Sequence, residues 1–397
     1  MTVDFPREAK AIAHELVTLR REIHRDPELG NDLPRTQARV VAALEGLPLE
    51  ITEGKTLTSV VAVLHGALPG PTVLLRGDMD ALPVAEENDL DYASTNGRMH
   101  ACGHDLHTAG LVGAAKLLSA HRDELRGSVV FMFQPGEEGP GGAKPMIEEG
   151  VLDAAGSRVE AAFGVHVMPG EQGVFTSRPG ALMAGANVLR AVFHGAGGHG
   201  SMPEKATDPV PPLVEFCQAL QVMVTRRFSV FDPVVASITN LSAGDAVNVI
   251  PASASMGASV RTLSAETTRD FPLYAKELAE SIAAGHGCSV EFDWVTQYPP
   301  TVNDSRETEY LMGTLSDVFG AERVVEANDP IMGSEDFSFV LEKIPGAFYM
   351  LQATPPDIDP EAVAFNHSPL VQFDDAVLAD QAASLAALAF TYRAREH

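Results

Sequence analysis

The stretch TAGLVGAAKLLSAHRDELRGSVVFMFQ, residues 108–134, contains the pattern that decides the fold class. Small and apolar residues recur at helical spacing over 108–125, and the apolar run at 129–134 is typical of a buried strand. The same alternation extends to both sides. Further helices are expected at 9–25 and 141–150, and further strands at 57–64, 71–75 and 160–167. Strands alternating with helices predict an α/β layer architecture.

The middle of the chain follows a different order, beginning at about residue 180. Its expected elements are a strand at 186–193, a helix from about 207 to 224, strands at 234–241 and 252–261, a helix at 265–284 and a strand at 289–295. This β-α-β-β-α-β order is that of a ferredoxin-like domain. After it come a helix at 307–319, one strand at 347–351 and a helix at 374–393, which provide too few strands for a separate sheet. We therefore predict that residues 1–183 and 298–397 form one domain, into which residues 184–297 are inserted as a second.

Composition excludes several functional classes. The 397 residues include 28 Lys and Arg against 54 Asp and Glu, a net charge of −26, which argues against a general nucleic-acid partner. A hydrophobic content of 45% and a charged content of 21% are typical of a globular protein. The opening residues lack the apolar segment of a signal peptide, and no apolar run is long enough to span a membrane. Since only three cysteines occur, we expect no disulfide framework and a cytoplasmic location.

The densest group of reactive side chains is MHACGHDLH, residues 99–107. One thiol and three imidazoles stand together before a helix, and such donors suit zinc, manganese, cobalt or nickel. A lone Cys or His is more often structural, but four such groups at one helix entrance favour a metal site. His107 lies one helical turn after His104. From this position it could bind the metal, hydrogen-bond to a metal ligand or lie on the surface, and we favour the hydrogen bond to a ligand.

Carboxylates and further histidines follow the apolar strands. Glu137 and Glu138 come directly after the strand at 129–134, at the strand end where α/β sheets place ligands. Two adjacent carboxylates can divide the work, one binding metal and the other moving a proton. The alternative is a solvated acidic turn. The remaining candidates also lie at strand ends or in loops: Asp78 and Asp80, which point the same way if extended, His166, which also fits a buried structural role, and His367, which is weak evidence alone.

Taken together in order, these segments resemble a known family. They are RGDMDALP (76–83), MHACGHDLH (99–107), FQPGEEG (133–139), GVHV (164–167), GGHGSMP (197–203), NVIP (248–251) followed by VRT (260–262), MGSEDFS (332–338) and FNHS (365–368). The set resembles the metal-dependent amidohydrolases that include hippurate hydrolases, indole-acetyl-amino-acid hydrolases and N-acyl-amino-acid deacylases, within the aminoacylase and carboxypeptidase superfamily. The resemblance runs from about residue 15 to residue 390. It implies a mixed-sheet hydrolase domain with two divalent metal ions and an inserted ferredoxin-like lid and dimerisation domain.

The resemblance also assigns roles to residues. By their positions in the motifs, the metal ligands are Cys102, His104, Glu138, His166 and His367. Glu137 matches the general base, which deprotonates a water and passes the proton to the leaving amine. Either Asp80 or Asp105 is expected to hold a ligand imidazole in its metal-binding tautomer. Asp78 stands where relatives in the wider superfamily carry a His. The Cys-x-His motif formed by Cys102 and His104 resembles the amidohydrolase branch more than the dipeptidase branches.

In the inserted domain, the resemblance implies contacts with substrate. His199 matches a residue that reaches the active site of a partner subunit and stabilises the oxyanion. Asn248 and Arg261 match substrate-contacting residues, and the Arg261 fork suits a carboxylate. Without the resemblance, Asn248 is a turn residue and Arg261 a surface charge. We expect Ser334 to cap the following helix, and Cys217 and Cys288 to be buried packing residues.

These expectations lead to one principal function and two alternatives. The principal one is a cytoplasmic homodimeric or homotetrameric amidohydrolase, an aminoacylase-type enzyme that cleaves N-acetyl, N-benzoyl or similar N-acyl amino acids. The first alternative is a dipeptidase or small-peptide carboxypeptidase with the same dimetal centre, which needs an acidic group for the free α-amine instead of an apolar acyl pocket. The second is a non-catalytic binding protein, against which the presence of both Glu137 and Glu138 argues.

Overall fold

The computed structural model describes residues 3–359 and 362–393, and these divide into two compact units. Unit 1 contains the chain up to Leu182, Val302–Asp329 and the residues from Phe339 onward. Unit 2 contains Met183–Thr301 and Pro330–Ser338. Residues 183, 298–301 and 330–338, which were expected in the first domain, belong to unit 2 in the structure. The outermost residues of the predicted bounds, 1–2 and 394–397, lie outside the described residues.

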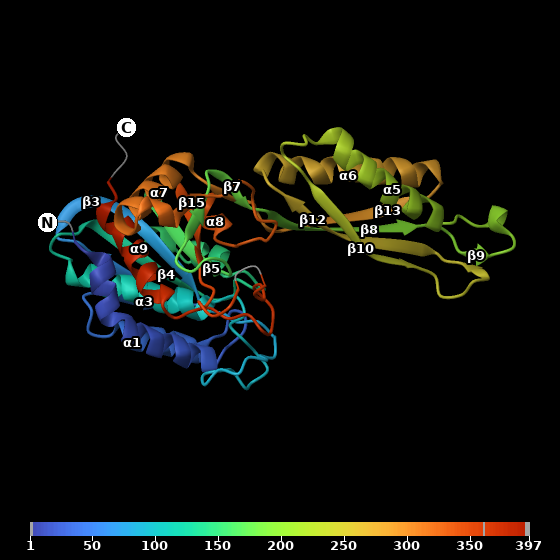
Figure 1. Ribbon diagram of the computed structural model, residues 1–397. Coiled ribbons are helices and arrows are strands. Elements are labelled where there is room, and N and C mark those ends of the chain that lie inside the picture. The colour runs from blue at the N-terminus through green and yellow to red at the C-terminus, as the bar shows by residue number, and fades with distance from the viewer. Residues whose placement is uncertain (1–2, 360–361, 394–397) are drawn as a thin grey trace. The chain divides into compact units, whose positions relative to one another are not determined.

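An eight-stranded mixed sheet forms the centre of unit 1 (Figure 1), in the order β1-β2-β4-β3-β5-β16-β6-β15. Its strands are β1 (Glu50–Glu53), β2 (Val60–His65), β3 (Leu68–Asp78), β4 (Arg126–Gln134), β5 (Ala161–Met168), β6 (Phe175–Ser177), β15 (Val324–Glu326) and β16 (Gly346–Gln352). The four central strands β4, β3, β5 and β16 are parallel to one another. They are rich in buried apolar residues, as parallel strands covered on both faces must be. Their carboxyl ends therefore meet at one edge of the sheet.

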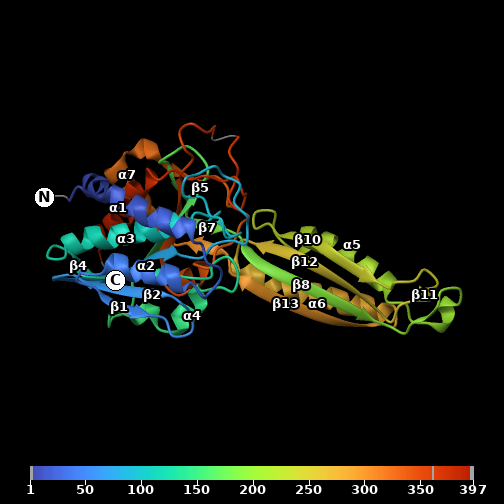
Figure 2. The same cartoon turned by 90° about the horizontal axis from the view of Figure 1, so that it is seen from below.

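Three helices of unit 1, α1 (Phe5–Arg25), α2 (Pro34–Leu44) and α9 (Val377–Thr391), pack against a buried central helix, α3 (His104–Ala120) (Figure 2). The other helices of this unit are α4 (Ala143–Glu148) and α7 (Ser305–Phe319); the short α8 (Ser338–Leu341) begins at the last residue of unit 2. Helix α3 contacts α1, α9 and the central strands, and its residues are almost all buried. A helix that is apolar on all sides is buried on all sides. Its first turn lies at the carboxyl edge of the sheet.

Unit 2 has a ferredoxin-like fold. Its antiparallel sheet has the order β10-β12-β8-β13 and carries the helices α5 and α6 on one face (Figure 1). The elements are β8 (Gly185–His194), α5 (Val210–Arg227), β10 (Val235–Ala243), β12 (Ser253–Thr262), α6 (Ala265–Gly285) and β13 (Ser289–Tyr298), with a small pair formed by β9 (Gly198–His199) and β11 (Val249–Ile250). The strands β7 (Gly180–Met183) and β14 (Thr301–Asn303) lie where the chain passes between the units. The helix-facing residues of β8 and β12, among them Leu189, Phe193 and Met256, form a core of their own.

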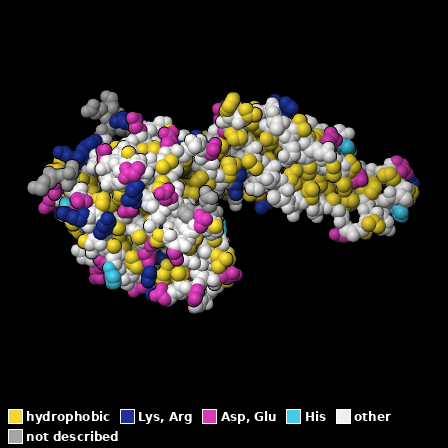
Figure 3. All heavy atoms as spheres, in the orientation of Figure 1, with side chains coloured by type: hydrophobic (Ala, Val, Ile, Leu, Met, Phe, Trp, Pro, Cys, Tyr) yellow, Lys and Arg dark blue, Asp and Glu magenta, His cyan; other side chains and the backbone are white. Residues whose placement is uncertain are grey.

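The surface agrees with the composition. On the face seen in Figure 3, acidic side chains are scattered among basic ones, and hydrophobic side chains are abundant on unit 2. Within the described residues, none of the helices combines the length and the apolar character that crossing a membrane requires. All three cysteines are free thiols.

Candidate metal centre

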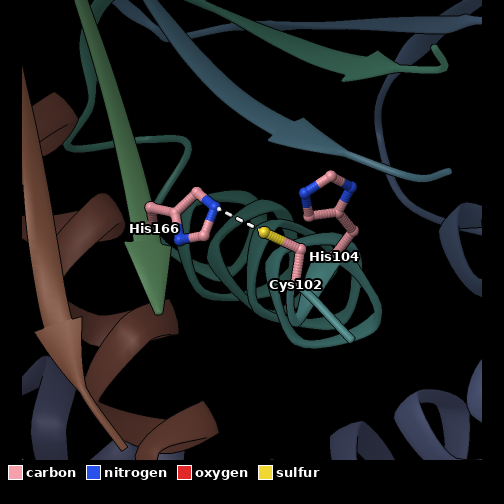
Figure 4. Close-up of side chains that lie close together, drawn as sticks. All are labelled: Cys102, His104 and His166. Carbon is pink, nitrogen blue, oxygen red and sulfur yellow. Dashed lines mark hydrogen bonds between the residues drawn. The ribbon is translucent and has the colours of Figure 1, made fainter. Parts of the chain in front are cut away.

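Four segments of the chain meet at the carboxyl edge of the unit 1 sheet. Strands β3 and β4 are in parallel register with Asp78 opposite Gln134, so the segments that follow them leave the sheet side by side. The neighbouring strand β5 carries His166 close to its end. The loop before α3 brings Cys102 and His104 to the same place (Figure 4). This is the edge at which α/β sheets place their ligands.

Cys102 and His104 face the site together because of the glycine between them. Gly103 has a φ of 79°, in the left-handed region, and a Cβ there would lie 2.2 Å from the Val167 Cγ2 atom. Only glycine tolerates both conditions. The backbone reversal places the Cys102 sulfur 3.4 Å from the Nε2 atom of His166 (Figure 4).

The His166 ring is held in one orientation. Its Nδ1 donates a hydrogen bond of 2.7 Å to the Val167 carbonyl oxygen. A donor at Nδ1 leaves Nε2 with a free lone pair in the neutral ring, and this is the atom that faces Cys102. The pKa of His166 lies well below its ordinary value because of burial and the neighbouring His107. The ring is therefore in the neutral form that binds metal.

His104 is completely buried, and neither ring nitrogen has a hydrogen-bond partner among the described residues. Its Nδ1 lies 3.4 Å from an Asp80 oxygen, and its Nε2 lies 3.6 Å from an Asp78 oxygen. Burial lowers the pKa of His104, but the charge of Asp78 and the contact with Asp80 offset it, so the pKa lies well above its ordinary value. A buried imidazole in so negative an environment is an unsatisfied site that suits a cation.

Asp80 arranges the two glutamates. Its two carboxylate oxygens accept the backbone N–H groups of Glu137 and Glu138, each at 3.0 Å. The turn that precedes them depends on Gly136, which has a φ of 76° and whose Cβ would lie 1.9 Å from the Asn31 Oδ1 atom. Asp80 thus contacts His104, and it fixes the glutamate turn, a role that the sequence did not reveal.

His367 closes the group from the loop before α9. Its Nε2 lies 3.1 Å from a Glu138 oxygen, and contacts with Cys102 and Glu138 raise the pKa of His367 to about 10. Burial and the Glu138 charge raise the pKa of the Cys102 thiol. The His367 side chain is 55% exposed, so this side of the group is open to solvent.

The donors form overlapping triads. The ligand atoms of Cys102, His104 and His166 lie within 4.8 Å of one another, as do those of Cys102, Glu138 and His367. A third group joins His104 with Glu137 and Glu138. A thiolate, imidazoles and a carboxylate are the donors that zinc and other first-row divalent ions prefer. Two triads that share Cys102 fit a pair of neighbouring ions.

His107 supports the site without offering a free nitrogen. Its Nδ1 donates to Asp78 at 2.5 Å, and its Nε2 accepts the Val167 N–H at 2.8 Å. Asp78 also binds the buried Arg76, which in turn contacts Gln134. These contacts favour the supporting role over the other two considered for His107, and Arg76 is a supporting residue that the sequence analysis missed.

The structure corrects the expectation for Asp105. Its carboxylate binds Arg20 at 2.6 Å and His24 at 2.8 Å, and none of its hydrogen bonds in the described residues goes to a predicted ligand. Burial raises the pKa of Asp105, but Arg20 and His24 outweigh it and hold the pKa far below its ordinary value. Asp105 points out of the metal group because it is the residue after His104 on a helix, about 100° further around the axis. It therefore anchors α3 to α1.

The remaining predicted site residues belong to unit 2. His199 is exposed in β9, where its Nδ1 contacts the Ser201 hydroxyl at 2.8 Å, and Asn248 lies beside it because its carbonyl accepts the Gly200 N–H. Arg261 is near the end of β12, opposite Ala186. Ser253, at the start of β12, is opposite His194, and eight residues of strand separate it from Arg261 by about 26 Å. Within one chain, Asn248 and Arg261 therefore cannot bind the same small carboxylate.

Two further expectations for unit 2 are wrong. Ser334 caps no helix, since α8 begins only at Ser338 and it is the Glu335 carboxylate that accepts the Phe337 N–H. Cys217 and Cys288 pack against the unit 2 core but are partly exposed rather than buried.

The fold and the donor set define a class of protein, the metal-dependent hydrolases of amide bonds with a dinuclear centre at the edge of an α/β sheet. The family model described as "Peptidase family M20/M25/M40" matches residues 74–391. The chain belongs to this family. The predicted resemblance to metal-dependent amidohydrolases, the mixed-sheet α/β fold and the expectation of two divalent metal ions are confirmed.

Among curated proteins, three similar relatives are named for different activities. Thermostable carboxypeptidase 2 of Saccharolobus solfataricus is 39% identical over 87% of this chain and 87% of its own. IAA-amino acid hydrolase ILR1-like 2 of Arabidopsis thaliana is 38% identical over 95% of this chain and 85% of its own. N-acetylcysteine deacetylase of Bacillus subtilis is 38% identical over 85% of this chain and 88% of its own.

Solved structures agree with this assignment. A putative aminohydrolase from methicillin resistant Staphylococcus aureus has a TM-score of 0.93 at 31% identity, over 99% of this chain and 100% of that one. The YXEP protein of Bacillus subtilis, described as a dinuclear metal binding peptidase from the M20 family, has a TM-score of 0.81 at 34% identity, over 96% of this chain and 98% of that one. Both likenesses extend over both units.

Proposed function

We propose that the protein hydrolyses the amide bond of N-acyl amino acids, with acyl groups such as acetyl or benzoyl, and releases a carboxylic acid and a free amino acid. The observation that carries the proposal is the pairing of Glu137 and Glu138 at a strand end, beside the group formed by Cys102, His104 and His166. Relatives named as an IAA-amino acid hydrolase and an N-acetylcysteine deacetylase support the substrate class.

In the proposed reaction, Cys102, His104, Glu138, His166 and His367 hold the two ions. Such ions polarise a carbonyl oxygen and lower the pKa of a water molecule. The Glu137 carboxylate takes the proton of the attacking water and delivers it to the leaving amine nitrogen. Glu137 is only 6% exposed, so bulk water does not compete for its proton. Asp80 keeps Glu137 in place through its backbone N–H.

We propose that each active site takes residues from two chains. His199 and Asn248 lie at one end of unit 2 and Arg261 near the other, so one small substrate reaches all three only if a second copy supplies one set. In this arrangement His199 stabilises the oxyanion, and Asn248 and Arg261 contact the substrate, whose carboxylate Arg261 binds with its planar fork. Burial lowers the pKa of Arg261, but a guanidinium keeps its charge at neutral pH.

The strand β10 is the proposed dimer contact. It is an edge strand of the unit 2 sheet, and its residues, VASITNLSA, carry no charge. Val235 and Leu241 are exposed on it, and Phe231 in the loop before it is 95% exposed. The opposite edge strand β13 carries Glu291 and Asp293, which discourage pairing. An uncharged edge of nine residues, with one irregularity between Ile238 and Asn240, is a template for antiparallel pairing with a second copy.

The alternative activity is that of a dipeptidase or small-peptide carboxypeptidase. This alternative is supported by a relative named as a thermostable carboxypeptidase, which is 39% identical to this chain. Both activities use the same centre, and they differ in whether the substrate's amine is blocked. For the location we propose the cytoplasm, because the three free thiols suit a reducing compartment.

The experiment that tests the activity is metal-dependent hydrolysis. The protein is stripped with a chelator, reloaded singly with zinc, manganese, cobalt or nickel, and assayed on N-acetyl and N-benzoyl amino acids beside unblocked dipeptides. We expect hydrolysis of the blocked amino acids only, and only after reloading. Activity confined to dipeptides would transfer the function to the alternative, and metal binding without any hydrolysis would overturn the proposed enzyme.

A further inference from the structure

The side-chain amide of Asn366 touches two parts of the metal centre at once. Its Nδ2 atom lies 3.6 Å from the Cys102 sulfur and 3.3 Å from the Val167 carbonyl oxygen. The same carbonyl accepts the Nδ1 hydrogen bond of His166 at 2.7 Å. One amide group therefore contacts one predicted ligand directly and the backbone anchor of another.

The chemistry fixes which end of the amide faces the centre. The Val167 carbonyl is an acceptor, so an amide oxygen in this position would place two acceptors against each other. The NH₂ group has two hydrogens, one for the carbonyl and one for the sulfur. A thiolate that holds a metal ion carries negative charge and accepts hydrogen bonds, so the second hydrogen is favourable when the ion is bound.

The backbone beside Asn366 needs such an anchor. His367 has a φ of 73°, and it is the one non-glycine residue with a positive φ among those the structure describes. A left-handed conformation is unfavourable for a residue with a Cβ, so surrounding contacts must maintain it. The His367 N–H donates to the Ala101 carbonyl at 2.8 Å. The contacts of the preceding Asn366 side chain with Cys102 and Val167 provide a second anchor for this backbone.

We propose that Asn366 is a positioning residue of the metal centre. Its amide aligns the Cys102 sulfur and, through the Val167 carbonyl, the His166 ring, while it places His367 on the same loop. Ligands from three separate segments are thus brought to the geometry of the bound state before the ion arrives. The proposal rests on the metal centre of the proposed function but not on its substrate, because metal binding itself is measured.

The test compares Asn366→Leu with the wild type. The change keeps the approximate size of the side chain and removes both hydrogen bonds. Cobalt affinity is measured by competition with a chelator, and the thiolate-to-cobalt absorption reports the geometry at Cys102. We expect affinity to fall about 10- to 100-fold, the range known for hydrogen-bond partners of ligands, and the absorption band to change.

Asn88→Leu is the matched control. The Asn88 amide also donates to a backbone carbonyl of this loop region, that of Val371 at 3.0 Å, but its described contacts include no predicted ligand. We expect this variant to keep the wild-type cobalt affinity and spectrum. If both variants lose affinity equally, Asn366 only anchors the loop and the proposal is overturned.

Two further outcomes are decisive. Wild-type affinity and spectrum in Asn366→Leu would overturn the positioning role and leave the proposed function intact, whereas a wild-type protein that binds no cobalt would overturn both. If Asn366→Leu fails to fold, Asn366→Ser, which removes the amide without adding bulk, is measured by the same criteria.

Discussion

At the scale of the single residue, Asp80 shows how one carboxylate organises a site. Its oxygens accept the N–H groups of Glu137 and Glu138, and one of them lies 3.4 Å from His104. Burial raises the pKa of Asp80, while His104 and the backbone donor counteract the rise. A single buried group thereby sets the relative positions of a predicted base and two predicted ligands.

The two adjacent glutamates are expected to have different roles, proton transfer for Glu137 and metal binding for Glu138. Glu137→Gln should retain both ions while turnover falls by about 100-fold or more, because the amide cannot accept the proton of the attacking water. Metal content is measured by elemental analysis and turnover on the preferred N-acyl amino acid.

Glu138→Gln is the comparison for this prediction, since it makes the same replacement of one carboxylate oxygen by an amide nitrogen at a predicted ligand. It should lower metal content as well as turnover. Full turnover in Glu137→Gln would remove the assignment of the base, and equal metal loss in the two variants would show that both glutamates are ligands.

At the scale of the element, the sequence predicts the long periodic segments well and their ends less well. The helix expected at 108–125 is α3 at His104–Ala120, because Gly103 reverses the backbone and lets the helix begin within the histidine cluster. Helix α2, Pro34–Leu44, was missed; it has Pro at its start but no side-chain cap. The edge strand β15 and its neighbour β6 have three residues each and depend on pairing with other strands.

The candidate site, too, could be predicted only in part from the sequence. The predicted ligands could be found because they lie in a dense cluster before a helix, at strand ends or in a loop, and because their motifs match the family, but their supports could not. Arg20 lies 85 residues before Asp105, and Asn366 lies 264 residues after Cys102. Nothing local to those positions reveals such contacts, which arise only when α1 packs against α3 and when β5 and the loop before α9 come together beside it.

Gly103→Ala tests the turn that precedes α3. The left-handed φ and the contact at 2.2 Å with Val167 both oppose a Cβ, so the free energy of unfolding should fall by about 2 kcal/mol or more. Metal affinity should fall as well, because Cys102 and His104 flank the turn. Chemical denaturation of the metal-free protein and cobalt titration measure the two effects.

Gly97→Ala is the control, because Gly97 has a φ of 78° but nothing within 4 Å of its Cβ position. In this variant the free energy of unfolding should fall only by the cost of the left-handed conformation, about 1 kcal/mol, and metal affinity should not change. An equal loss in the two variants would show that the contact with Val167 is relieved at no cost.

At the scale of the whole molecule, oligomeric state and activity are expected to change together. The double variant Ser237→Lys/Leu241→Lys places charges on the β10 edge and should convert a dimer to a monomer in light scattering. Activity should fall when the dimer is lost, because His199 and Asn248 would no longer reach a second chain. Val295→Lys, on the opposite edge strand β13, should leave both unchanged. A wild-type protein that is monomeric and fully active would exclude the two-chain site.

The insertion of unit 2 between the metal-binding segments determines when the residues of the centre are synthesised. The residues of the triad Cys102, His104 and His166 precede unit 2 in the chain, whereas the triad of Cys102, Glu138 and His367 requires a residue that follows all of it. Strand β5, which carries His166, pairs with β16, and α3 packs against α9, so the first triad also reaches its geometry only after the segments beyond unit 2 have been made. The metal centre is therefore completed late in translation, once the whole of unit 2 has been synthesised.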